Sequence, residues 1–318
     1  MFVQIEEDLK ILNVNLNKMV GPRHPILYAA AEHLFHAGGK RIRPSIIMLV
    51  AKATSTKEQL KNEHRRLAEI TEIIHTASLL HDDVIDDCNQ RRGSGTVNNK
   101  FSNKIAILAG DFLFAQSSWY LANLNNLEVV KIISKIITDF AEGEIQQALA
   151  SFETSISIDN YINKSFHKTA SLIAYSCKAA AILSNADKNT QNQFYLYGKH
   201  LGLAFQIVDD ILDITGTYKN MGKVPGSDLK NGNLTAPLLF ALEECPNLHS
   251  LIEREFDGKK DTEKAIQLIK LTKGIEKAQD LAIEHSQAAI QAIKNVPYKN
   301  TSIKNLILLS EQIVNRVQ

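Results

Sequence analysis

Long stretches of this sequence lack helix-breaking residues, and this restricts the fold more than any other feature. Residues 60–87 contain neither glycine nor proline, and their apolar side chains recur three and four residues apart, as on one face of an α-helix. The same spacing marks 104–124, 128–151, 158–184 and 190–213. No alternating pattern of useful length predicts a strand. We therefore expect an all-α chain.

The last third of the chain predicts shorter helices. Its helical pattern over 235–317 is interrupted near Pro246, Gly258, Gly274 and Pro297. With 15 glycines and 7 prolines among 318 residues, the tight turns of a β-sandwich or β-barrel are scarce. This length allows one large domain or two ordinary ones, and no shift in composition marks a boundary. We expect one large helical bundle with an internal cavity.

Charge and cysteine content exclude several classes of protein. The 36 basic and 35 acidic residues nearly cancel, whereas a general nucleic-acid-binding domain is usually basic. The three cysteines lie far apart, and an odd number argues against a disulfide framework. We see no apolar run of the about 18 residues that a membrane span needs. The N-terminus is acidic by residue 6 and resembles neither a secretory signal nor a transit peptide.

Two similar acidic motifs are the strongest chemical signal. DDVID starts at Asp82 and DDILD at Asp209, each at the C-terminal end of a predicted apolar helix. Side chains four residues apart share a helix face, so Asp82 projects with Asp86, and Asp209 with Asp213. Such close carboxylates repel each other, and the helix C-terminus disfavours their charge further. Carboxylates without His or Cys partners suit Mg²⁺ completed by phosphate. The alternative is two solvated acidic helix ends.

Basic residues stand where they could meet a polyphosphate. Arginine grips phosphate with two parallel hydrogen bonds, whereas lysine acts as a point charge. His75 lies two helical turns before Asp82, and Gln206 lies three residues before Asp209. A lone histidine on an apolar helix is more often a core residue, and an arginine pair is more often solvated. The basic candidates are Lys40, Arg41, Arg43, Arg91, Arg92, Lys168 and Lys223.

Taken together, these motifs resemble the trans-isoprenyl diphosphate synthases. The segments stand in that family's order over about residues 30–240: GGKRIRP, HTASLLHDDVIDD, RRG, KTA, FQIVDDILD and GKVPGSDLKNGNLTAP. The likeness is nearest to the long-chain, solanesyl-type polyprenyl diphosphate synthases of cyanobacteria and plastids. It implies an isoprenoid-synthase-type bundle of roughly 10–13 helices around a central cavity. It also implies a single polyprenyl diphosphate synthase domain over residues 1–318.

The resemblance implies a role for each motif. The chain would be a prenyltransferase that uses up to three Mg²⁺ ions to condense isopentenyl diphosphate onto an allylic diphosphate. The metal ligands would be Asp82, Asp86 and Asp209, and Lys168 would join them as a catalytic residue. Isopentenyl diphosphate would be held by Lys40, Arg43, His75 and Arg92. The allylic diphosphate would be held by Arg91, Lys168, Thr169, Gln206 and Lys223. Asn233 departs from the pattern, because many relatives carry a lysine in that loop.

The residues before the first motif predict a long product. Ala77 and Ser78 are small, whereas relatives with short products typically carry a bulky aromatic residue at one of these positions. Beyond them lie aliphatic residues, Ile74, Ile73 and Ile70. One isoprene unit spans roughly three helical residues, so we expect a product of about C30–C50, near C45, as a prenylquinone side-chain precursor. The alternative for the small pair is close packing of two helices.

Assembly and location follow from the same resemblance. We expect a homodimer that pairs through the apolar helix over 104–124, with no transmembrane segment. We expect a soluble protein of a bacterial cytoplasm or plastid stroma. Three alternatives stay open: a short-chain farnesyl or geranylgeranyl diphosphate synthase, a non-catalytic subunit of a heteromeric synthase, and a terpene cyclase. The last two usually lack one of the two aspartate-rich motifs that this chain has.

Overall fold

The computed structural model describes residues 3–20, 25–36, 39, 41–55, 59–91, 93–216, 225–298 and 300–317. The described contacts group the chain into two compact units. The first comprises Met1–Ile137, Leu172–Gly198 and Ala292–Leu309. The second comprises Thr138–Ser171, Lys199–Gln291 and Ser310–Gln318. The expected single domain over residues 1–318 stays a prediction.

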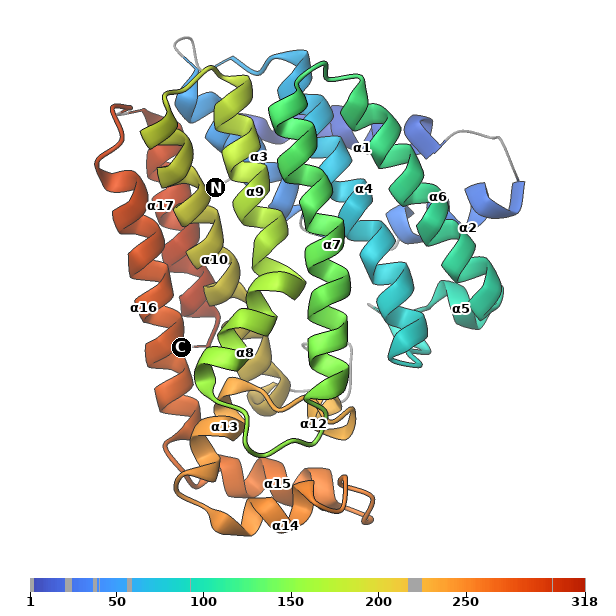
Figure 1. The fold of residues 1–318 in the computed structure, drawn as a ribbon, viewed down its shortest axis with the longest axis vertical. Helices are drawn as coiled ribbons and strands as arrows, with labels where there is room; N and C mark the ends of the chain where they lie inside the picture. The colour runs from blue at the N-terminus through green and yellow to red at the C-terminus, as the bar shows by residue number, and fades with distance from the viewer. Residues whose placement is uncertain are drawn as a thin grey trace. The chain divides into compact units, whose positions relative to one another are not determined.

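The described chain is helical almost throughout, which confirms the all-α class (Figure 1). Four of the long predicted helices are present with ends shifted by two residues or fewer: α4 (Asn62–Ile85), α6 (Asn103–Ala122), α7 (Leu127–Leu149) and α10 (Lys188–Thr215). The first unit also holds η1 (Val3–Ile5), α1 (Glu6–Val20), α2 (Pro25–His36), α3 (Ile42–Thr54) and α5 (Val97–Lys100).

The last third of the chain forms the shorter helices that its breakers predict. Pro246 opens the turn η3, and α16 starts at Gly274 and ends before Pro297. The long loop expected over 215–233 contains one short helix, α12, and its residues 217–224 lie outside the described part. These elements are α12 (Ser227–Lys230), α13 (Ala236–Leu242), η3 (Pro246–Leu248), α14 (His249–Ile252), α15 (Asp261–Lys270), α16 (Gly274–Lys294), α17 (Thr301–Val314) and η4 (Asn315–Val317).

In the first unit, α4 packs against both α3 and α6 (Figure 1). From Pro44 to Ala51 every residue of α3 is buried, as expected for a helix that is apolar on all sides. A Cβ atom at Gly110 of α6 would lie 2.2 Å from Nε2 of His81 on α4, so only glycine lets that imidazole reach α6. His81 thus has a packing contact, and the sequence had suggested no function for it.

The predicted helix over 158–184 is interrupted in the structure. It consists of α8 (Ile158–Ser165), a π-helical turn η2 (Phe166–Ala170) and α9 (Ser171–Leu183). Beside the turn, a Cβ at Gly202 of α10 would lie 2.6 Å from the Cα of Ala170. The turn therefore packs closely against α10. Single π-turns inside helices are often found at functional sites.

A small hairpin follows the first acidic motif. Strand β1 (Gln90–Arg91) pairs antiparallel with β2 (Ser94–Gly95). Gly93 between them has φ of 77°, a left-handed conformation that glycine adopts without strain. Two-residue strands leave no alternating pattern, which is why the sequence did not predict them.

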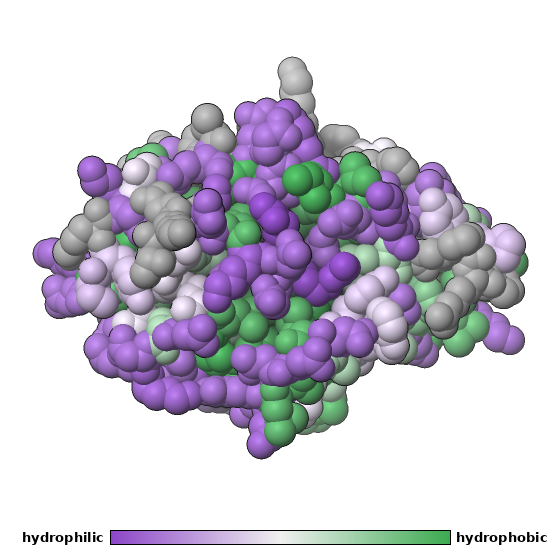
Figure 2. Space-filling model, turned by 90° about the horizontal axis from the view of Figure 1, so that it is seen from above, coloured by the Kyte–Doolittle hydropathy of each residue, from purple (hydrophilic) through white to green (hydrophobic). Residues whose placement is uncertain are grey.

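Helix α6 is the one helix in the described residues that is long and apolar enough to cross a membrane. Core helices of water-soluble proteins meet the same two conditions, so this finding alone does not identify a span. A third of its apolar window is buried inside the protein. Its exposed large apolar side chains are Ile107, Leu108 and Trp119. The face of the molecule in Figure 2 is mostly hydrophilic, with hydrophobic side chains visible between.

We expect acid to destabilise the first unit through His64. This side chain is fully buried beside Ser184, at 3.1 Å between Nε2 and Oγ. Burial, and then the charge of Lys61, lower the pKa of His64 from 6.5 to about 4. Between these values the unfolded chain binds a proton that the folded chain does not, so stability falls as pH falls from 6.5. The loss from this residue at pH 5 is about 2 kcal/mol.

Urea unfolding at pH 7 and pH 5 measures this effect. The His64→Gln variant should lose less unfolding free energy between the two pH values than the wild type. His249→Gln, at the start of α14, is the control and should behave as the wild type does. Equal losses for the wild type and His64→Gln would contradict the assignment.

Candidate active site

The first acidic motif closes α4 and separates its aspartates by burial. Asp86 caps the helix, and its backbone N–H donates to the carbonyl of Asp82 at 2.8 Å. The two residues are one helical turn apart, and both are partly exposed. Asp83 is buried and accepts the guanidinium of Arg91, with Nη2 at 2.7 Å and Nε at 2.9 Å. The motif thus offers Asp82 and Asp86 as candidate metal ligands and uses Asp83 to hold an arginine.

Arg91 is positioned by the β1–β2 hairpin. Burial alone would lower its pKa, but the hydrogen bond and charge of Asp83 outweigh burial, and the pKa of Arg91 is raised. The guanidinium therefore stays charged. The sequence suggested Arg91 as a diphosphate ligand, and the structure places it within a few ångströms of the motif. Arg92 and Lys40, which were predicted to hold isopentenyl diphosphate, lie outside the described residues.

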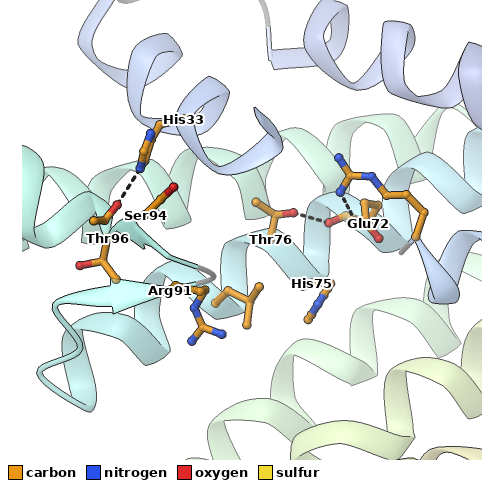
Figure 3. A pocket seen from close by; sticks show the side chains of 10 residues that line it. His33, Glu72, His75, Thr76, Arg91, Ser94 and Thr96 are labelled. Atoms are coloured by element: carbon orange, nitrogen blue, oxygen red, sulfur yellow. Dashed lines mark hydrogen bonds and ion pairs between the residues drawn. The ribbon is translucent and has the colours of Figure 1, made fainter. Parts of the chain in front are cut away.

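A small pocket in the first unit gathers further predicted residues (Figure 3). Nη1 of Arg43 lies 3.0 Å from Nε2 of His75, so α3 and α4 bring together two residues predicted to hold isopentenyl diphosphate. Arg41 forms a 2.5 Å ion pair with Glu72, and it is the residue before α3. His75 and Arg91 point to the same side in Figure 3. The lining includes His33, Arg41, Glu72, His75, Arg91 and Thr96.

The second acidic motif belongs to the second unit and anchors a chain of hydrogen bonds. Asp210 is buried, and it accepts the Tyr161 hydroxyl at 2.6 Å and the Gln206 amide at 2.7 Å. Gln206 in turn accepts the Thr169 hydroxyl at 2.7 Å. Burial, and then the charge of Asp228, raise the pKa of Asp210 to about 7. Two predicted substrate residues, Gln206 and Thr169, are thus linked to the motif.

The other two aspartates of this motif have different surroundings. Asp213 is buried and accepts the Ser227 hydroxyl at 3.0 Å and the Asp228 backbone N–H at 3.3 Å. Asp209 keeps 40% of its side chain exposed and pairs with Arg316 at 2.9 Å. Asp209 is therefore the aspartate of this motif best placed to bind a cation from solvent.

The π-helical turn η2 carries the predicted KTA residues. Nζ of Lys168 forms an ion pair with Glu144 of α7 at 2.7 Å. The next residue, Thr169, donates a hydrogen bond from its hydroxyl to Gln206 of α10. The structure thus links both residues to neighbouring helices of the second unit. Lys223, predicted for the same diphosphate, lies outside the described residues.

Several neighbours of the site were not predicted from the sequence. Tyr161 and Arg316 contact the second motif, and Lys164 donates a hydrogen bond to the side-chain oxygen of Asn233. Burial lowers the pKa of Lys164. The amine of Lys164 therefore lies beside Asn233, at the position in the loop where many relatives carry a lysine. These pairs are 49, 107 and 69 residues apart along the chain, so no local pattern indicated them.

A further acidic group also went unpredicted. Asp139, Glu142 and His167 have ligand atoms that all lie within 4.8 Å of one another. Nδ1 of His167 is 3.8 Å from Glu142, and Glu142 is exposed.

The donor atoms of both motifs fit a hard divalent cation. Asp82, Asp86 and Asp209 offer only carboxylate oxygens, and all three are at least partly exposed. Such oxygens are the ligands that Mg²⁺ prefers when phosphate completes its shell. Asp82 and Asp86 in the first unit, and Asp209 in the second, would each be able to hold such an ion. The buried Asp83, Asp210 and Asp213 accept hydrogen bonds within the protein.

Comparison with known proteins decides the family. The sequence profile of the polyprenyl synthetase family matches residues 24–269. The chain belongs to this family. The matched region contains both acidic motifs and η2. A polyprenyl synthetase is a prenyltransferase, and this confirms the class of enzyme predicted from the motifs.

Relatives of this polyprenyl synthetase come from algae, plants and bacteria. A prenyl transferase of Porphyra purpurea is 58% identical over 317 residues, which is 100% of this chain and 98% of the relative. Solanesyl diphosphate synthase 1, chloroplastic, of Arabidopsis thaliana is 52% identical over 93% of this chain and 74% of its own. The crystal structure of heptaprenyl diphosphate synthase from Staphylococcus aureus matches with a TM-score of 0.94, 33% identity and full coverage of both chains. The predicted isoprenoid-synthase fold is therefore confirmed.

Proposed function

We propose that this polyprenyl synthetase adds isopentenyl diphosphate repeatedly to an allylic diphosphate and releases a product of about C30–C50, near C45. The observation that carries the proposed length is the small pair Ala77 and Ser78 on α4, one turn before Asp82. Ala77 is fully buried, and the buried Ile70, Ile73 and Ile74 lie further back on the same helix. An alkyl chain that grows back along α4 from Asp82 would therefore meet no Phe, Tyr or Trp side chain of this helix at these positions. The solanesyl diphosphate synthase names of relatives support the same length.

The chain's own residues suggest how the reaction proceeds. Asp82 and Asp86 of the first motif and Asp209 of the second would hold Mg²⁺, which would supply positive charge to the departing diphosphate. Arg91, Lys168, Thr169 and Gln206 hold that allylic diphosphate, and Arg43 and His75 hold isopentenyl diphosphate. The fixed cations stabilise charge that develops as the carbon–oxygen bond breaks. The double bond of isopentenyl diphosphate attacks the allylic carbon, and the proton then leaves with the released diphosphate.

Product analysis tests the proposal. The purified chain is incubated with Mg²⁺, isopentenyl diphosphate and a labelled allylic primer, and the dephosphorylated products are separated by chain length. We expect a long product that appears only with the divalent cation. Exclusive C15 or C20 products would identify a short-chain synthase. No product from any primer would identify a non-catalytic subunit.

We expect Arg43 to act mainly on isopentenyl diphosphate. Its contact with His75 at 3.0 Å gives the two side chains a common orientation. Losing a charged hydrogen bond to phosphate costs about 1.5–3 kcal/mol, so Arg43→Ala should raise KM for isopentenyl diphosphate about ten- to a hundredfold. Steady-state kinetics with each substrate varied in turn measures this, and Arg43→Lys should recover part of the affinity. A rise confined to the allylic primer would mean that the two pockets are exchanged.

We further propose that the protein is located in a bacterial cytoplasm or plastid stroma. We also propose that it forms a homodimer that pairs through α6. Leu108 and Trp119 are 45% and 60% exposed, and a spacing of eleven residues puts them on the same face of this helix. Light scattering should give twice the chain mass of 35.4 kDa. Leu108→Glu should shift the mass toward the monomer, whereas Leu271→Glu, at a site 84% exposed elsewhere, should not. An active wild-type monomer would contradict the proposal.

A further inference from the structure

The last turn of the chain places an arginine on the second acidic motif. In η4, Nη1 of Arg316 donates to Oδ1 of Asp209 at 2.9 Å. Its guanidinium carbon also lies 5.4 Å from the centre of the Phe205 ring. Phe205 and Asp209 are four residues apart on α10 and share one face. Two separate contacts, an ion pair and a cation–π contact, therefore hold the same guanidinium over this face.

Asp209 accepts a hydrogen bond from a charged side chain, whereas the hydrogen bonds described above for Asp210 and Asp213 come from uncharged groups. Asp210 accepts hydrogen bonds from the Tyr161 hydroxyl and the Gln206 amide, and Asp213 accepts one from the Ser227 hydroxyl. These three donors are neutral, and the charge of Lys164 also acts on Asp210. Asp209 accepts its hydrogen bond from a guanidinium, which carries a full positive charge. A guanidinium in that place repels a divalent cation that approaches the same carboxylate.

We propose that Arg316 is an internal counter-ion for Asp209, which a divalent cation has to displace before Asp209 can bind it. This inference rests on the proposed role of Asp209 as a metal ligand. The side chains of Arg316 and Asp209 are 37% and 40% exposed, so water and salt screen the pair. A screened pair of this kind is weak enough to be displaced, and it raises the metal concentration that the second motif requires.

Binding of Mn²⁺, followed through the electron paramagnetic resonance signal of the free ion, tests the inference without relying on turnover. Exposed ion pairs contribute about 0.2–1 kcal/mol, so Arg316→Gln should tighten Mn²⁺ binding by about 1.5- to fivefold. Arg316→Lys should resemble the wild type. Arg254→Gln is the matched control, because it removes the same charge from a different ion pair of the second unit, with Asp261. It should leave the affinity unchanged.

Two more measurements separate the possible failures. Raising the salt concentration should narrow the difference between the wild type and Arg316→Gln, because salt screens the pair. Asp209→Asn should weaken Mn²⁺ binding. If it does so while Arg316→Gln binds no more tightly than the wild type, the counter-ion role is wrong and the metal site stands. If Asp209→Asn binds Mn²⁺ as the wild type does, the metal role of Asp209 fails, and the counter-ion role fails with it.

Discussion

Replacing Asp82 or Asp209 by alanine should lower the condensation rate by about 10²–10⁴-fold while the chain stays folded. Both side chains are partly exposed at the ends of α4 and α10, so their loss leaves no buried cavity. The diphosphate carries negative charge that the carboxylates would repel without a cation between them. A variant that cannot hold the cation therefore cannot stabilise the leaving group.

Asp87→Asn is the matched control for this experiment. Asp87 directly follows the motif, is exposed, and has φ of 48°, a conformation that asparagine tolerates as well as aspartate does. Its substitution should leave the rate near that of the wild type. Helical content measured by circular dichroism shows whether each variant is folded. Near-normal turnover by folded Asp82→Ala or Asp209→Ala would show that these residues are not the metal ligands.

Replacing Ala77 by tyrosine should shorten the product to about C15–C20 while the condensation reaction continues. Ala77 is fully buried on α4, five residues before Asp82. A phenol ring there would stand across the path that we propose for the growing alkyl chain. Diphosphate binding lies beyond the new ring, so the first condensation steps should proceed. Chain-length analysis of the products, with turnover measured in parallel, gives both results.

A control at Ala68 separates a blocked path from a disturbed core. Ala68 is also fully buried on α4, nine residues further from the motif. Overpacking a core commonly costs about 1–3 kcal/mol, so Ala68→Tyr and Ala77→Tyr should both lower the melting temperature. Only Ala77→Tyr should shorten the product to that length. If Ala77→Tyr is destabilised but makes the wild-type product, the small residue serves helix packing and the proposed path is wrong.

The predictable parts of the fold are the helices whose apolar residues recur at helical spacing within one continuous segment. Helices α4, α6, α7 and α10 follow from apolar spacing within each segment, and their predicted ends lie within two residues of the observed ones. The π-helical turn at Phe166–Ala170 was not predicted, because its residues are ordinary helix formers and the extra residue per turn leaves no mark in the pattern. The hairpin at Gln90–Gly95 was too short to give a strand signal.

The candidate site likewise has parts that the local sequence predicts and parts that depend on contacts between distant segments. The spacing of four residues in the two acidic motifs predicts which side chains share a helix face, and in the structure Asp82 and Asp86 are one helical turn apart. The spacing does not predict that Asp83 is buried in an ion pair with Arg91. Nor does it predict that Asp210 is buried and accepts a hydrogen bond from Tyr161. Those contacts depend on how separate segments meet in the folded chain. Three predicted residues, Lys40, Arg92 and Lys223, lie outside the described part, and their roles stay predictions.

The π-helical turn has a consequence for how this segment can change in evolution. One extra residue rotates everything after it by about 100° relative to an unbroken helix. Deleting one residue from Phe166–Ala170 would let α8 and α9 join as one regular helix with all backbone hydrogen bonds made. The same deletion would turn Lys168 and Thr169 away from Glu144 and Gln206. Such a deletion would therefore keep the helical hydrogen bonds of this segment but lose the contacts that Lys168 and Thr169 make with neighbouring helices.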